Sequence, residues 1–182
     1  MKSIPTKPKL ETTSMIYEIT VPQFTKMLKN LDAILGKAIP YAESKKIEIE
    51  VLLQSRLAPD QFNLLRQIQI ATDTAKIGVA KLTGKDAPVH DDKETTLPQL
   101  RTRIADVVNF LATITEKDFA GAHERKITTP RWENKYLLGH EYLIQHTIPN
   151  LYFHISVAYE ILRHNGLDIG KKDYLGQMPF RT

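Results

Sequence analysis

Apolar side chains recur every three or four positions through several long segments of the chain, which is the spacing of one buried helix face. The first segment starts at Thr20 to Gln23, which is typical of a capping box with proline in the first turn. We therefore predict that the first long helix begins at Thr20 and that Pro40 disturbs its hydrogen bonds. Its stripe consists of Phe24, Met27, Leu28, Leu31, Ile34, Leu35 and Ala38.

Two further helices follow the same pattern. Pro59 opens the second, which ends at Gly84, a residue suited to a left-handed C-cap. The third begins at a second capping box, Thr96 to Gln99, and residues 85–95 connect it to the second helix. The second stripe consists of Leu64, Ile68, Ala71, Ala75, Val79 and Leu82, and the third of Leu100, Ile104, Val107, Val108, Leu111 and Ile114.

The residues before the last helical segment differ in type from those of the helices. Residues 125–138 contain β-forming residues on either side of a turn, which predicts a small β-hairpin. The pattern from His140 to His164 is helical, Gly166 is a stop signal, and Pro149 should kink or restart the helix. Four amphipathic helices pack most economically against one another, so the predicted fold class is all-α: a four-helix bundle with a small β-hairpin before the last helix.

The composition limits the classes of protein. The chain has 182 residues, of which 42% are hydrophobic and 25% charged, which fits one domain with a full hydrophobic core. We predict a flexible N-terminal arm over residues 1–13 and a single helical-bundle domain over residues 14–182. The absence of cysteine excludes zinc ribbons, iron–sulfur clusters, thiol catalysis and disulfide scaffolds.

Charge and hydropathy limit the partners. The net charge is +4, but the basic residues form scattered pairs rather than a stripe, so we expect no nucleic-acid partner. The apolar runs are too short for a secretory signal or a membrane span, so we expect no membrane association and a cytoplasmic location. The segment 78–85 fails as a phosphate loop, because five residues separate its glycines and Asp86 replaces the serine or threonine that binds magnesium.

One group of polar residues on the last helix is a candidate site. His146, Asn150 and His154 are spaced four residues apart and therefore line one helix face. Neighbours in this column lie about 6 Å apart along the helix, whereas His146 and His154 lie about 12 Å apart and cannot share one metal ion. Alternatively, these histidines are buried residues that hydrogen-bond to the backbone or to neighbouring carboxylates.

The second helix carries two further candidates. Arg66 and Asp73 share a face that is separate from the main apolar stripe. Asp73 therefore either faces inward, where it orients a histidine or pairs with Arg66, or is a solvated acid on the helix surface.

Long, non-repetitive strings of the sequence also carry a family resemblance. They are YEITVPQF (17–24), RLAPD (56–60), QIQIATDTAK (67–76), PNLYFH (149–154), ILRHNG (161–166) and IGKKDYLG (169–176). These strings resemble the domain-of-unknown-function family numbered nineteen-ninety-three, a branch of the DinB/YfiT-like four-helix-bundle superfamily. The resemblance implies a DinB-like bundle.

The superfamily further implies a metal site in thiol-dependent transferases, hydrolases and isomerases. Its ligands are one histidine from the second helix and an H-x-x-x-H pair from the last helix. The resemblance places Ile70 at the first of these positions and Asn150 and His154 at the pair. Only His154 matches, so we predict a degenerate metal site that holds no metal and no cofactor.

Two hypotheses about function follow. In the first, a pocket between the second and last helices binds a small-molecule ligand; His154 and Asp73 are its catalytic pair, and Asn150, His146 and Arg66 bind the ligand. In the second, the chain is a non-catalytic bundle that acts through protein association.

A homodimer is the predicted assembly. The last helix carries Tyr152, Phe153 and Tyr159, which give it more apolar surface than one buried stripe requires.

Overall fold

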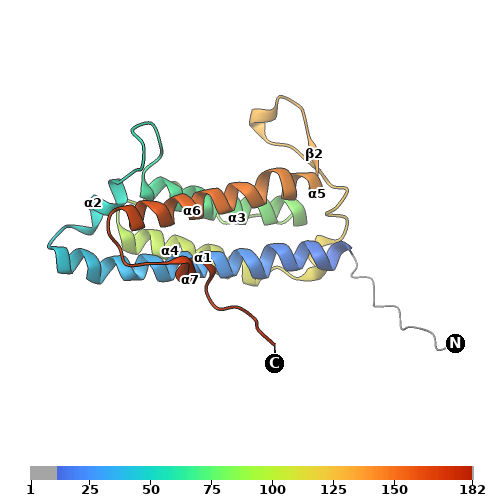
Figure 1. Ribbon diagram of the computed structural model, residues 1–182. Coiled ribbons are helices and arrows are strands. Elements are labelled where there is room, and N and C mark those ends of the chain that lie inside the picture. The colour runs from blue at the N-terminus through green and yellow to red at the C-terminus, as the bar shows by residue number, and fades with distance from the viewer. Residues whose placement is uncertain (1–11, 182) are drawn as a thin grey trace.

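Four long helices run side by side in the computed structural model, which describes residues 12–181 (Figure 1). The helix α3 packs along α6 on one side and α4 on the other, and α1 completes the bundle by packing against α4 and α6. The predicted all-α fold is therefore confirmed. The four helices are α1 (Thr12–Lys45), α3 (Leu64–Thr83), α4 (Leu97–Ala112) and α6 (Ile148–His164).

Short elements connect the long helices. The strands β1 and β2 pair antiparallel, with Lys126 opposite Leu138 and Ile127 opposite Leu137, which confirms the predicted hairpin before the last helix. It lies at the end of the bundle opposite to α2 (Figure 1). The short elements are α2 (Ile49–Gln54), η1 (Glu116–Phe119), β1 (Lys126–Ile127), η2 (Pro130–Trp132), β2 (Leu137–Leu138), α5 (Gly139–Tyr142), η3 (Leu143–Thr147) and α7 (Lys171–Leu175).

The core consists of the predicted apolar stripes. Phe24 of α1, Ile68 of α3, Val107 of α4 and Leu151 of α6 are all fully buried. Burying a side chain of this size contributes roughly 1.5–3 kcal/mol relative to leaving it exposed. Because each long helix supplies such a stripe, the bundle has one continuous apolar core.

The start of α1 differs from the prediction. The helix begins at Thr12, so Thr20 lies inside it and caps nothing. The Thr20 side chain is fully buried, and its hydroxyl donates to the Ile16 carbonyl at 2.6 Å. Ile16 and Val21 join the core, which extends the helix upstream of Pro22. Residues 1–11 of the predicted arm lie outside the described residues.

The start of α3 also differs, whereas two predicted caps are confirmed. The helix begins at Leu64 rather than near Pro59, because the Asn63 side chain caps it by accepting from the Arg66 amide. Gly84 ends α3 in the left-handed conformation, with φ of +76°. The Thr96 amide donates to the Gln99 side chain, as expected for a capping box.

The last helical segment contains an irregular turn. The elements α5, η3 and α6 follow one another directly, and η3 is a π-helical turn that ends immediately before α6. Pro149 lies in the first turn of α6, where its missing N–H is tolerated, so the predicted restart near this residue is confirmed. Single π turns of this kind often occur near functional sites.

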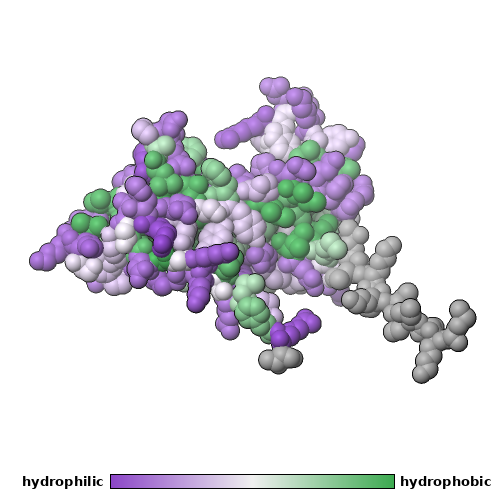
Figure 2. Space-filling view, in the orientation of Figure 1, coloured by the Kyte–Doolittle hydropathy of each residue, from purple (hydrophilic) through white to green (hydrophobic). Residues whose placement is uncertain are grey.

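Polar residues cover most of the surface and are interrupted by apolar patches (Figure 2). Among the helices described, none combines the length and the apolar character that crossing a membrane requires.

Candidate functional site

The candidate site lies where α3 and α6 pack along one another. Two side-chain pairs join the helices there: His154 Nδ1 lies 2.7 Å from Gln67 Oε1, and Asn150 Nδ2 donates to Thr74 Oγ1 at 2.7 Å. Both predicted residues of α6 therefore face α3.

Hydrogen bonding fixes the tautomer of His154. Gln67 Nε2 donates to the Phe62 carbonyl at 3.0 Å, so Gln67 Oε1 is the atom that faces His154 and can only accept. The proton is therefore on His154 Nδ1, and Nε2 carries the lone pair. Within residues 12–181 no group hydrogen-bonds Nε2, although this nitrogen keeps contact with solvent.

The surroundings of His154 keep it neutral. The residue is 8% exposed, and burial lowers the pKa of His154 below its usual 6.5; the positive charge of Arg66 lowers the pKa further. The Phe153 ring meets the imidazole edge to face at a centroid distance of 5.2 Å. The result is an oriented, uncharged imidazole that can accept a proton or a hydrogen bond at Nε2.

Asn150 presents its amide group in a defined orientation. The Thr74 hydroxyl donates to the Ile70 carbonyl, so its oxygen accepts from Asn150 Nδ2. The Asn150 carbonyl oxygen is then the atom left for a ligand, within one helix turn of His154.

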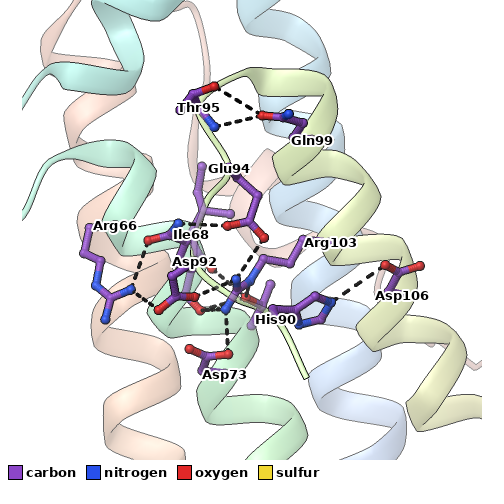
Figure 3. Close-up of polar contacts among 12 residues, drawn as sticks. Arg66, Ile68, Asp73, His90, Asp92, Glu94, Thr95, Gln99, Arg103 and Asp106 are labelled. Carbon is purple, nitrogen blue, oxygen red and sulfur yellow. Dashed lines mark hydrogen bonds and ion pairs between the residues drawn. The ribbon is translucent and has the colours of Figure 1, made fainter. Parts of the chain in front are cut away.

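Asp73 does not orient His154, which corrects the sequence-based hypothesis. Its carboxylate accepts from Arg103 Nη2 of α4 at 2.6 Å (Figure 3). The same carboxylate lies 3.0 Å from Lys76 Nζ. The position that Asp73 was predicted to occupy beside the imidazole is taken by Gln67. Asp73 therefore belongs to an ion-pair network between α3 and α4.

Arg103 is the centre of that network. Its side chain is almost fully buried and also donates to Asp92 Oδ1 at 2.7 Å and to Glu94 Oε1 at 3.0 Å. Asp92 and Glu94 belong to the connection between α3 and α4, so Arg103 fastens this connection to the bundle (Figure 3).

Arg66 pairs with Asp92 rather than with Asp73. Arg66 Nη1 donates to Asp92 Oδ2 at 2.5 Å and to Gln69 Oε1 at 3.0 Å. Figure 3 shows Arg66 at the edge of the network away from α4. Arg66 is therefore the member of the network that lies one residue before Gln67, the partner of His154.

His146 has a separate environment. Its ring stacks on Tyr142 at a centroid distance of 5.1 Å and meets Trp132 edge to face at 5.8 Å. Burial, followed by the charge of Lys81, lowers the pKa of His146. Among the described residues, no hydrogen bond joins His146 to Asn150 or His154. The three predicted members of the column thus do not form one hydrogen-bonded group.

Sequence reasoning missed Gln67 and Arg103. Gln67 lies three residues after Leu64 and four before Ala71, and Arg103 has the same relation to Leu100 and Val107. Both are therefore polar residues at stripe positions, and both are 1% exposed. A polar residue within an apolar stripe is the signal that identifies them.

The residues at the superfamily metal positions do not fit a metal ion. Ile70 offers no donor atom, and Asn150 offers a neutral amide oxygen, which is a poor ligand for transition metals. One histidine is too few for a site that normally needs three protein ligands. Across residues 12–181, no group of three or more histidine, aspartate or glutamate side chains is placed to hold a metal.

Comparison with solved structures establishes the class of protein. The chain is similar to a protein with the description "crystal structure of a DinB family member protein" from Shewanella denitrificans, with 60% sequence identity and a TM-score of 0.93. The match covers 96% of this chain and 99% of that chain. The protein is therefore a DinB-like four-helix bundle.

The particular family follows from the sequence match. A family model described as "Domain of unknown function (DUF1993)" matches residues 16–175, so the chain belongs to this family. No curated protein matches the chain.

Proposed function

We propose that the site between α3 and α6 binds a small molecule without a metal ion and uses His154 Nε2 as a general base or hydrogen-bond acceptor. The observation that carries this proposal is the hydrogen bond from His154 Nδ1 to Gln67 Oε1. It holds the imidazole in the tautomer whose lone pair is at Nε2, and a neutral imidazole in a fixed orientation is the form that abstracts a proton.

Two further features support a binding role. Asn150 is held by Thr74 and contributes an unused amide oxygen beside the base. The lowered pKa of His154 keeps the base unprotonated at neutral pH.

A ligand screen tests the proposal. Purified protein is titrated with thiol cofactors and small electrophiles while NMR follows the ring nitrogens of His154. We expect a binder that shifts the Nε2 resonance and that loses about tenfold or more in affinity in His154→Ala, since hydrogen bonds to a ligand of this kind contribute about 1–2 kcal/mol. His164→Ala is the matched control, because His164 is an exposed histidine of the same helix.

The tautomer provides a second measurement that needs no ligand. Gln67→Met should remove the preference for a proton on Nδ1, which nitrogen chemical shifts report directly. A binder whose affinity is unchanged in both His154→Ala and Asn150→Ala would contradict the proposal.

A non-catalytic homodimer is the alternative. Tyr152 and Tyr159 do not supply the predicted free apolar surface, because Tyr152 accepts from Gln23 and Tyr159 packs on Tyr174. Phe153 and Ile144 do, since they are 55% and 57% exposed. The two exposed side chains support association through the last helical segment.

Sedimentation distinguishes the alternative. A dimer that weakens in Phe153→Ser, without any ligand that depends on His154, would favour association over catalysis. A mass of about 20.8 kDa at every micromolar concentration would exclude it.

In either case, we propose the cytoplasm as the location.

A further inference from the structure

Within the described residues, the guanidinium of Arg66 donates hydrogen bonds through one of its three nitrogens. Its Nη1 donates to both Asp92 and Gln69, whereas within the described residues neither Nε nor Nη2 has a hydrogen-bond partner. These two nitrogens form one edge of the planar group, and this edge has the spacing that binds both oxygens of a carboxylate.

In two other arginines, Arg101 and Arg103 of α4, both Nε and Nη2 donate hydrogen bonds. Arg101 presents the same Nε and Nη2 edge to Asp32, with distances of 2.7 and 2.9 Å to the two carboxylate oxygens. Arg103 uses all three nitrogens for Thr72, Asp73 and the connection between α3 and α4. Arg101 thus makes, in this same chain, the bond to both oxygens of a carboxylate that Arg66 does not make.

The free edge of Arg66 is also held in place. Asp92 bridges the two arginines, since Oδ2 accepts from Arg66 and Oδ1 accepts from the buried Arg103. Asp92 adopts a φ of +57°, which is uncommon for a residue other than glycine and is maintained here by the two ion pairs. Gln69 is buried and is fixed by its own bond to Glu94. Arg66 is therefore preorganised, which lowers the entropic cost of binding.

The location of Arg66 favours an anion. The residue lies in the first turn of α3, where the dipole of a 20-residue helix adds positive potential. It directly precedes Gln67, the partner of His154, and its charge acts on His154. Arg66 and His154 therefore border one region at the start of α3.

From this arrangement we propose that the ligand of the α3–α6 site is a carboxylate, which binds both Nε and Nη2 of Arg66 while the rest of the molecule faces His154 Nε2. The inference rests on the proposed function, because it names the ligand class for that site. Asp92 and Gln69 act as positioning residues for the guanidinium.

NMR titration with benzoate, with benzamide as its neutral analogue, tests the inference. We expect benzoate to bind at least about tenfold more tightly than benzamide and to shift the Arg66 Nε–H resonance. Binding should also raise the pKa of His154, because the carboxylate offsets the Arg66 charge. Arg66→Gln should remove the preference for benzoate, and Arg66→Lys should restore only part of it. Arg56→Gln, which removes an exposed arginine that bonds to the Pro59 carbonyl, should leave the preference unchanged.

The outcomes separate this inference from the proposed function. Equal binding of benzoate and benzamide, no binding of benzoate up to tens of millimolar, or inorganic phosphate binding as tightly as benzoate would overturn the carboxylate assignment. A neutral binder whose affinity depends on His154 but is unchanged in Arg66→Gln would also overturn the carboxylate assignment, and it would leave the proposed function intact. Benzoate binding that depends on Arg66 but is unaffected by His154→Ala would instead contradict the role proposed for His154.

Discussion

Replacing Arg103 with methionine should destabilise the bundle more than any exposed ion pair could. The guanidinium is 1% exposed and donates to three carboxylates, to the Thr72 hydroxyl and to the Gln69 carbonyl. Methionine keeps the apolar stem and removes all of these bonds, so the loss comes from the weakened pairing of the carboxylates. Asp73 keeps Lys76 and Asp92 keeps Arg66, whereas Glu94, within the described residues, keeps only its hydrogen bond from Gln69.

The exposure of those carboxylates sets the magnitude. Removing one partner of a buried ion pair typically costs about 3–5 kcal/mol. The side chains of Asp73, Asp92 and Glu94 are 26%, 33% and 14% exposed, so water can solvate them in part. We therefore expect the lower end, a loss of about 3 kcal/mol in the free energy of unfolding, which is a fall in Tm of about 6–12 °C for a chain of this size.

Urea unfolding followed by circular dichroism measures the effect, with Arg101→Met as the matched control. The Arg101 side chain is 38% exposed, and Asp32 is its single ion-pair partner within residues 12–181, so its loss should cost about 1 kcal/mol or less. Equal losses in the two variants, or a loss below about 1 kcal/mol in Arg103→Met, would refute the reasoning.

The pH dependence gives an independent check on the cause. Burial alone raises the pKa of Asp92 and of Glu94, but hydrogen bonds from Arg103, and for Asp92 also from Arg66, outweigh it and lower each pKa below its usual 3.8 and 4.5. A lowered carboxyl pKa stabilises the folded state above the unfolded pKa and loses that contribution as pH falls through the folded value. The difference between wild type and Arg103→Met should therefore be largest near neutral pH and shrink below about pH 4. A difference that stays constant with pH would indicate lost packing rather than lost charge.

The structure makes two further predictions, one on stability and one on metal content. Gly78→Ala should lower the free energy of unfolding by about 1–2 kcal/mol despite the better helix propensity of alanine, because its Cβ would overlap Thr147 Cγ2. Adding Thr147→Ser should recover part of the loss, and an unchanged or higher Tm in the single variant would contradict the close approach. Protein purified without added metal should contain no stoichiometric transition metal, because Ile70 and Asn150 replace two of the three expected ligands. Elemental analysis that finds one zinc, nickel or iron ion per chain, lost in His154→Ala, would restore the metalloenzyme hypothesis.

The amino-acid sequence by itself determined the architecture of the bundle. The spacing of residues such as Ile68 and Val107 identified the buried faces, because helix periodicity is a local property. Caps at Gly84 and Thr96 were also readable, since the chemistry that ends a helix lies within a few residues of it. The start of α1 was not, because Ile16 extends the helix through contacts with distant parts of the core.

The candidate site, too, could be predicted from the sequence only in part. The sequence selected His154 and Asn150, which the structure places against α3. It could not assign the partner of His154, because that depends on how α3 and α6 are rotated and shifted against one another, and a difference of one residue exchanges Gln67 for a neighbour. Asp73 faced the wrong helix in the sequence-based hypothesis for this reason, since the carboxylate pairs with the buried Arg103. Local spacing thus decided which faces are buried, and only the packing of the helices decided which polar side chains meet.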